Sequence, residues 1–215
     1  MLQRVLFCSL SLVLLSALSA AAEPAPTPPT ITVDRLLSEL SKMPGLEAKF
    51  VERKHLKLLV KPLVTKGTLY FTSPGYLARH VISPKPARMV ITPKHLEIAQ
   101  DQGTQRIDLS ARKDVKTFVE SFARLLAGDK KALGAVYVLK FTASQAAPDT
   151  WSLSLTPRSQ TLRALIKRLV ITGKGYAVRR IRVDERSGDW TETEITEANP
   201  KRRFEPDERK RLFGF

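Results

Sequence analysis

Apolar and polar residues alternate over three successive stretches between residues 46 and 81. The apolar positions that set this alternation are Leu46, Ala48, Phe50, Leu69 and Phe71. A period of two residues is typical of strands that bury one face. Gly67 and the pair Pro74-Gly75 interrupt the pattern with residues that favour turns. The stretch therefore predicts an antiparallel meander of three strands with a wide apolar face.

Similar runs recur along the rest of the chain, separated by turn-forming residues. They predict strands at residues 88–92, 95–99, 104–109, 136–142, 151–156, 165–172, 176–184 and 189–196. Pro93-Lys94 favours a hairpin between the first two of these strands, and Gly173-Lys174-Gly175 separates two later ones. The link at residues 185–188 is short enough to force another hairpin. Both halves together give roughly ten or eleven antiparallel strands.

Helical spacing appears at two places. Residues 32–43 carry Val33, Leu36, Leu37 and Leu40 on one face, with an acidic residue in the first turn and Pro44-Gly45 at the end. Residues 112–127 form a second amphipathic helix with a broad apolar face, which Gly128 ends. A short helical turn at residues 129–133 follows. The pattern assigns no element to residues 200–215, which are rich in Lys and Arg.

So large an antiparallel sheet curls, because its right-handed twist accumulates from strand to strand. The curled sheet has a concave apolar face, and the two amphipathic helices have the apolar faces needed to cover it. An acyl chain of similar polarity would fit the same place, since each buried methylene contributes about 0.8 kcal/mol. The pattern does not distinguish a lipid pocket from an ordinary packed core.

The candidate pocket consists of apolar residues on the strands and on the helix at residues 112–127. It comprises Phe50, Leu69, Phe71, Leu77, Met89, Ile91, Phe118, Phe122, Leu139, Phe141, Leu153, Leu155, Ile181 and Val183. A shift of one residue in any strand would exchange the inner and outer faces. The list therefore depends on the register of each strand.

The first 22 residues predict a secretory signal peptide. One positive charge is followed by an apolar run and by the small residues Ser19-Ala20-Ala21-Ala22. The apolar run is shorter than the roughly 20 residues that a membrane-spanning helix needs. Cys8, the single cysteine, lies within this segment, so the mature chain is expected to have no disulfide and no thiolate. A flexible, proline-rich leader at residues 23–31 and one domain at residues 32–215 are expected to follow.

Charge is the unusual feature of the composition. Lys and Arg total 36 against 21 Asp and Glu, which gives a formal net charge of +15. Such a charge attracts anionic surfaces, including lipid headgroups and acidic polysaccharides. The secretory signal argues against nucleic acid as the partner. Arg179, Arg180 and Arg182 are the candidate residues for anionic docking, and a solvated strand face is the alternative interpretation.

The sequence shows no catalytic constellation. His55, His80 and His95 are the three histidines, and they are scattered among predicted strands without short metal-ligand spacing. No serine lies in a Gly-x-Ser-x-Gly turn. Glu192 and Glu194 alternate with Thr on one strand, which is typical of an exposed charged face. We therefore expect neither an enzyme nor a bound metal or cofactor.

The order of these features resembles the periplasmic outer-membrane lipoprotein carrier family, the LolA-like proteins. The resemblance spans about residues 33–199. It rests on Leu46, Ala48, Phe50, Gly67, Leu69, Phe71, Pro74, Gly75, Trp151, Leu153, Leu155, Pro157, Asp184 and Gly188. It implies a mainly β fold with α, in which about eleven antiparallel strands form an unclosed, strongly curved half-barrel with helices as a lid.

The resemblance also implies a function. A periplasmic monomer would take up the acyl chains of lipoproteins, or of another lipid or amphiphile, from an inner-membrane release complex. It would pass them to an outer-membrane acceptor, with only transient contact with the membrane surface. Ser73 stands where members often have an Arg that hydrogen-bonds to the lid, and the family's final strand motif is not evident in residues 203–215. The alternative is a filled β-domain that binds anionic envelope components or partners through its basic face.

Overall fold

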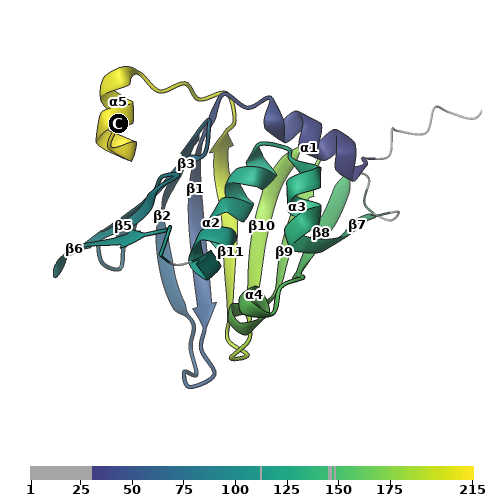
Figure 1. The fold of residues 1–215 in the computed structure, drawn as a ribbon, viewed down its shortest axis with the longest axis horizontal. Coiled ribbons are helices and arrows are strands. Elements are labelled where there is room, and N and C mark those ends of the chain that lie inside the picture. Colours follow the sequence, from purple (N-terminus) through teal and green to yellow (C-terminus); the bar gives the residue numbers. More distant parts are fainter. Residues whose placement is uncertain (1–30, 112, 145–146, 148) are drawn as a thin grey trace, which may run out of the picture.

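The computed structural model describes residues 31–111, 113–144, 147 and 149–215. The predicted signal peptide and the predicted leader up to residue 30 lie outside the described residues. What is described forms one curved sheet with helices packed on it (Figure 1).

Eleven strands form a single sheet in the order β6-β5-β4-β3-β2-β1-β11-β10-β9-β8-β7. Every neighbouring pair is antiparallel, and β6 and β7 are the two free edges, so the sheet is not closed. This confirms the predicted fold class. The strands are β1 Gly45–His55, β2 Leu63–Thr72, β3 Tyr76–Ser83, β4 Ala87–Ile91, β5 His95–Gln100, β6 Gly103–Asp108, β7 Tyr137–Ala143, β8 Thr150–Pro157, β9 Ile166–Lys174, β10 Ala177–Glu185 and β11 Trp190–Asn199.

The helices are α1 Val33–Ser41, α2 Lys113–Leu126, α3 Lys130–Val136, α4 Gln160–Leu165 and α5 Pro206–Phe213. The first four pack on one face of the sheet, which we call the inner face, and α5 packs on the opposite, outer face (Figure 1). Their ends follow local chemistry. The side chain of Thr32 accepts a hydrogen bond from the Arg35 amide at 3.3 Å, and Asp129 accepts one from the Ala132 amide at 2.8 Å.

Gly128 ends α2 in a left-handed conformation (φ 68°), as the sequence predicted. A side chain here would also collide with the Leu37 carbonyl oxygen and with the Ser41 side chain of α1. The glycine therefore serves two purposes: it turns the chain toward α3, and it lets α1 approach closely.

Three helices differ from the sequence prediction. The strand predicted to begin at Leu165 begins at Ile166, because Ser159 caps a short helix, α4, through its bond to the Leu162 amide at 3.2 Å. Val136, predicted to begin a strand, is instead the last residue of α3, which is longer than the predicted turn. The C-terminal segment, to which no element was assigned, contains α5.

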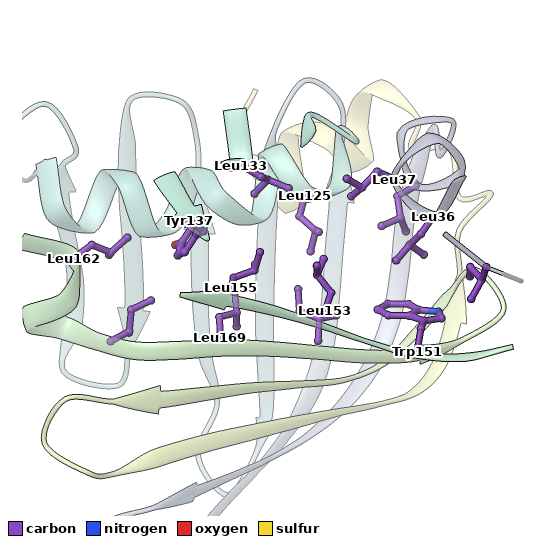
Figure 2. Packing of buried hydrophobic residues seen from close by; sticks show 14 residues of the cluster. Leu36, Leu37, Leu125, Leu133, Tyr137, Trp151, Leu153, Leu155, Leu162 and Leu169 are labelled. Carbon is purple, nitrogen blue, oxygen red and sulfur yellow. The ribbon is translucent and has the colours of Figure 1, made fainter. Parts of the chain in front are cut away.

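The main core lies between α1–α4 and the strands β7–β10. Figure 2 shows leucines of α1, α2 and α3 lying close to the side chains of β8 and β9. Leu36, Leu133, Leu153 and Leu155 are each 0% exposed. Burying an aliphatic side chain of this size contributes about 1.5–3 kcal/mol, so this cluster holds the helices on the sheet.

Trp151 closes one end of this core. Its ring lies against Gly173 on the neighbouring strand, where any side chain would collide with the indole, and its Nε1 donates to the Gly175 carbonyl oxygen at 2.7 Å. The Gly173-Lys174-Gly175 segment is therefore a strand end and turn that receives a tryptophan, consistent with the predicted hairpin.

Candidate functional site

The register brings all the predicted pocket residues on strands to the inner face. Leu77 lies between Phe71 and Ile91 in one row across the sheet, and Met89 lies in the next row with Leu69. On the other side of β1, Leu153 pairs with Phe141 and with Ile171, which pairs with Ile181. Leu155 and Leu169 join Leu139 and Val183 in the same way.

The helices fill one half of this inner face, at β7–β10. Leu153 and Leu155 are fully buried against α1–α4. The predicted pocket residues that pack around them, only partly buried, are Phe118, Phe122, Leu139, Phe141, Ile181 and Val183. The structure therefore assigns Leu153 and Leu155 to the core of the protein, which was the alternative that the sequence left open.

The other half of the inner face, at β2–β6, is less completely covered. A smaller cluster of Ile91, Leu96 and Leu109 forms its base. Apolar side chains that pack on this base remain partly exposed: Leu77, Met89, Ile98, Ile107 and, from α2, Val119. Phe71 is buried in the same row as Leu77. We call this half the open apolar face.

Polar residues interrupt the apolar inner face on β1, β2, β3 and β11, next to a small apolar cluster of Ala48, Phe50 and Ile195. Arg79 Nη2 donates to Glu52 Oε1 at 2.7 Å and to Thr65 Oγ1 at 3.1 Å. Thr193 Oγ1 donates to the second carboxylate oxygen, Oε2, at 3.1 Å. The side chains of Glu52 and Arg79 are each 22% exposed. These four residues form the inner-face polar strip.

Phe50 contacts both the polar strip and the apolar residues beside it. Its ring is 1% exposed and packs beside Gly67 of β2, where a Cβ atom would clash with both the ring and the His80 carbonyl oxygen. The guanidinium of Arg79 lies over the Phe50 ring, 4.6 Å from its centroid. An aromatic ring under a guanidinium stabilises the cation and fixes its direction. Arg79 is therefore held toward Glu52.

Sequence reasoning missed the polar strip, although the signal was present. Glu52 follows Phe50 by two residues, and Arg79 follows Leu77 by two, so the alternation that predicted apolar inner positions also places these charges on the inner face. The prediction considered only apolar residues, so it did not include charged residues at inner-face positions.

The candidate docking arginines lie on the outer face or at its edge, and two of them are paired. Arg180 Nε lies 3.6 Å from Glu192 Oε1, and Arg182 Nε donates to Asp184 Oδ1 at 2.7 Å. Arg179 occupies an irregularity in the pairing of β10 with β9 and is exposed. With Arg180 it lines an open hollow of about 890 Å³, together with the polar side chains of Thr142, Ser152, Thr172 and Glu194.

Carboxylates therefore neutralise much of the basic outer face. Asp184 also accepts from Arg168 at 2.8 Å. Burial alone would raise the pKa of Asp184, but the hydrogen bonds from Arg182 and Arg168 outweigh it and hold the pKa below its usual value. Arg53 pairs with Glu194 at 3.3 Å on the same face.

The three histidines lie apart in different surroundings. His55 stacks on Trp190 with ring centroids 3.6 Å apart, and His95 Nδ1 lies 3.2 Å from Thr92 Oγ1. Burial and the nearby charge of Arg88 lower the pKa of His80. Within the described ranges, no three His, Cys, Asp or Glu side chains gather in a way that could hold a metal ion. None of the described helices is both long and apolar enough to cross a bilayer.

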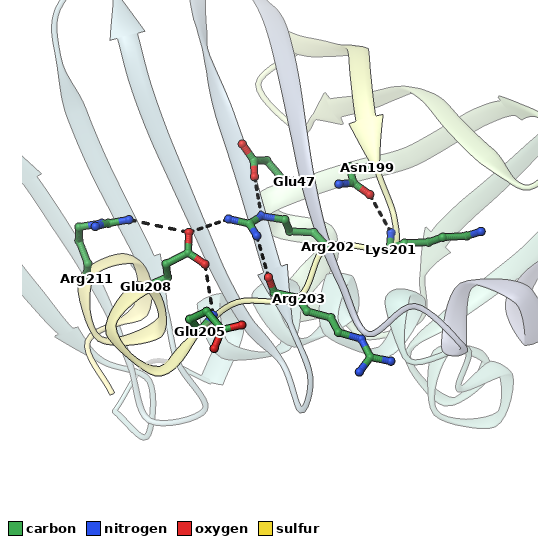
Figure 3. Close-up of polar contacts among 8 residues, drawn as sticks. All are labelled: Glu47, Asn199, Lys201, Arg202, Arg203, Glu205, Glu208 and Arg211. Carbon is green, nitrogen blue, oxygen red and sulfur yellow. Dashed lines mark hydrogen bonds and ion pairs between the residues drawn. The ribbon is translucent and has the colours of Figure 1, made fainter.

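The basic C-terminal segment is bound to the sheet by ion pairs (Figure 3). Arg202 donates from Nε to Glu47 of β1 at 2.9 Å and from Nη2 to Glu208 of α5 at 2.6 Å. Phe204 and Phe213 then pack on Ala78 and Val90 of the outer face. Arg202 therefore has a structural role in joining α5 to the first strand.

The family model described as "Outer membrane lipoprotein carrier protein LolA-like" matches residues 25–202. The chain belongs to this family. The match ends before α5. The part of this LolA-like chain that matches the family model therefore comprises the sheet and the inner-face helices. Comparison with curated proteins finds no match.

Several solved structures are similar to this LolA-like chain. A LolA superfamily protein, NE2245 from Nitrosomonas europaea, is 10% identical over 83% of this chain and 97% of its own, with a TM-score of 0.44. A putative outer membrane lipoprotein-sorting protein domain from Vibrio parahaemolyticus is 10% identical over 81% and 93%, with a TM-score of 0.46. MucB in complex with MucA(peri) is 13% identical over 81% of this chain and 57% of its own, with a TM-score of 0.40.

Proposed function

We propose that this protein binds acyl chains of lipoproteins, or of another lipid or amphiphile, on its open apolar face and carries them through the periplasm toward the outer membrane. The observation that carries the proposal is the set of half-buried apolar side chains on β3, β4 and β5 and on α2. Membership of the LolA-like family supports the same function. As the family resemblance implies, an inner-membrane release complex would supply the cargo and an outer-membrane acceptor would receive it.

The two halves of the inner face differ in what they offer a ligand. An acyl chain entering the β7–β10 half would have to displace fully buried leucines, and each would lose about 1.5–3 kcal/mol of burial energy. On the open apolar face, Leu77, Met89 and Ile98 already expose part of their surface. There each methylene of a chain gains about 0.8 kcal/mol without breaking the core.

The polar strip sets the limit of this site. A chain that extended past Phe50 would cover the Glu52–Arg79 pair and remove it from water, which costs more than the methylenes would gain. We therefore propose that the acyl chain ends at the strip. The protein is proposed to act by binding alone, without a catalytic step or a cofactor.

The alternative, a domain that binds anionic partners through its basic strands, receives less support. Arg180 and Arg182 point to nearby carboxylates that already compensate their charge. Binding through such a face would also be screened strongly by salt, whereas acyl binding would hardly change.

The proposal is tested with a fluorescent fatty acid and the purified protein. Met89→Asp on the open apolar face should weaken binding by more than about ten-fold, because a carboxylate would replace an apolar contact with the chain. Val138→Asp is the matched control, since Val138 is an apolar strand residue that is 49% exposed and points away from the inner face. Circular dichroism checks that both variants fold.

Mass spectrometry of lipids extracted from protein purified out of the periplasm would identify the cargo. If folded Met89→Asp and Val138→Asp bind the fatty acid equally well, or if the unchanged protein binds no acyl compound, the open apolar face is not the site and the proposal fails.

A further inference from the structure

The loop between β1 and β2, residues 56–62, carries the most exposed apolar side chains of the described residues. Leu58 is 96% exposed, Val60 is fully exposed and Leu59 is 46% exposed. Figure 1 shows this hairpin projecting past the β10–β11 turn and α4, at the bottom of the view. Leu63 and Val64, at the start of β2, are 49% and 41% exposed. Aliphatic side chains at a projecting tip gain nothing from the fold itself.

The charged residues of the loop and of the strand ends beside it are all basic, and the acidic residues that face them, Glu185, Asp189 and Glu194, come from β10, β11 and the turn between those strands. Residues 53–66 include the basic residues Arg53, Lys54, Lys57, Lys61 and Lys66 and no Asp or Glu. Lys57 and Lys61 directly flank the three aliphatic residues and are exposed. The tip is therefore apolar at its end and cationic at its sides.

The base of the loop is fixed to the neighbouring turn. The Lys57 amide donates to Asp189 Oδ1 at 2.9 Å, and the Leu59 amide donates to the Leu56 carbonyl oxygen at 3.0 Å. Just before the loop, His55 stacks on Trp190. A braced base presents the tip in one direction, so docking would not first have to order a free chain.

We propose that the β1–β2 loop docks this protein on a bilayer that contains anionic lipids. Leu58, Leu59 and Val60 enter the boundary between headgroups and acyl chains, and Lys57 and Lys61 bind lipid phosphates. The charge complementarity selects this partner, because lysines that flank an apolar tip can keep their ammonium groups at the headgroup level while their stems lie along the apolar region.

This inference extends the proposed membrane contact of the carrier by naming the surface that makes it. It places that contact on the loop and not on Arg179, Arg180 and Arg182, two of which are occupied by carboxylates. It does not depend on the acyl site of the open apolar face, because the loop would bind a vesicle with or without cargo.

Co-sedimentation with phosphatidylcholine vesicles, with and without phosphatidylglycerol, provides the test. The double variant Leu58→Ser/Val60→Ser should lose about ten-fold or more of its partitioning to vesicles that contain phosphatidylglycerol. Lys57→Gln/Lys61→Gln should lose about twenty-five-fold on the same vesicles, since each lysine contributes roughly five-fold, and should change little on phosphatidylcholine alone.

Matched controls change the same residue types elsewhere. Val138→Ser alters an exposed aliphatic residue on β7, and Lys131→Gln/Lys140→Gln removes two exposed lysines from α3 and β7. Neither control should alter partitioning by more than about two-fold, the scatter expected for changes outside the contact.

Three results would overturn the inference. The first is that the unchanged protein binds vesicles of neither kind, and the second is that the loop variants bind like their controls. The third is a dimer in sedimentation equilibrium that Leu58→Ser/Val60→Ser abolishes, which would mean that a second copy covers the tip. Fatty-acid binding separates the two proposals. The loop variants should bind the fatty acid as tightly as the unchanged protein, whether or not they lose vesicle binding. A failure of the docking inference therefore leaves the acyl site untouched.

Discussion

Replacing Arg79 by methionine tests how the inner-face polar strip is held together. The change keeps most of the side chain's length and its packing on Phe50, but it removes the donor to Glu52 Oε1 and to Thr65 Oγ1. Glu52 then keeps its bonds from Thr193, at 3.1 Å, and from Thr65, at 3.4 Å, but loses the cation that pairs with it. The carboxylate would remain only 22% exposed, with two threonine hydroxyls and no cation beside it.

The cost follows from the exposure of the pair. An ion pair on the surface contributes about 0–1 kcal/mol, whereas leaving one buried charge without its partner costs about 3–5 kcal/mol. With both side chains 22% exposed, the pair lies between these limits. We expect Arg79→Met to lower the free energy of unfolding by about 2 kcal/mol.

The double variant Glu52→Leu/Arg79→Met distinguishes two effects: the loss of the attraction between Glu52 and Arg79, and the cost of leaving Glu52 charged without a cation. Removing both charges should restore most of the stability, because well-packed apolar residues can replace a buried ion pair at little cost. Urea unfolding followed by circular dichroism, on both single variants and the double variant, gives the coupling energy. We expect about 1.5–2 kcal/mol.

The double variant should also bind acyl chains more tightly, since the open apolar face would then continue past Phe50 toward the β10 and β11 strands. A coupling energy below about 0.3 kcal/mol, within the range of independent sites, would refute this account of the strip. Unchanged acyl affinity in a stable double variant would show that the strip does not end the site.

Three further predictions concern other parts of the fold. Gly67→Ala should destabilise the protein by about 3 kcal/mol or prevent folding, because its Cβ atom would meet the His80 carbonyl oxygen and the Phe50 ring. Gly134→Ala in α3 is the matched control, since its Cβ atom would lie 3.7 Å from the Leu139 side chain, an ordinary contact. It should stabilise the protein by about 0.5–1 kcal/mol in thermal unfolding. The pKa of His80 lies below its ordinary value of 6.5 in the folded protein, so the unfolded chain takes up the proton first and stability should fall as the pH drops through about 6.5; His80→Gln should flatten that part of a plot of unfolding free energy against pH. Phe213→Ala removes a buried side chain, 2% exposed, and should weaken the packing of α5 on the sheet by about 3 kcal/mol. Hydrogen exchange should then be faster in residues 206–213, and acyl binding should not change. Equal exchange in that segment would mean that Phe213 does not hold α5.

The strand content of this protein could be predicted from its sequence because one face of each strand is buried. Alternation along β1, β2 and β8 survives in the structure as rows of apolar residues on the inner face. The helices α1 and α2 were predicted for the same reason, since their apolar stripes have helical spacing. In contrast, α4 has six residues and buries only Leu162, which is too little pattern to recognise.

The C-terminal helix was missed although its ends carry signals. Glu205 and Glu208 form a capping box, Pro206 stands in the first turn, and Gly214 ends the helix with φ 82°. Its two buried residues, Leu212 and Phe213, are adjacent and show no helical period. The cap was therefore the better evidence, and the apolar pattern gave none.

The sequence predicted which strand residues share the inner face, but not which part of that face the helices cover. Alternation determines which strand residues share a face, and it placed Leu77 and Leu153 together on the inner one. It cannot tell which part of that face the helices cover, because this depends on where α1–α4 pack in space. Leu153 proved to be core for that reason, while Leu77 remained partly exposed.

The pairing of β1 with β11 constrains how the chain can assemble. These two strands lie near opposite ends of the described sequence, yet they form the junction between β2–β6 on one side and β7–β10 on the other. A chain emerging from its N-terminus can pair β1 with β2 at once, but the sheet stays in two separate pieces until residues 190–199 arrive. During synthesis the apolar surfaces of both pieces would thus stay uncovered until almost the whole polypeptide is available, a period in which holding chaperones would be of most use.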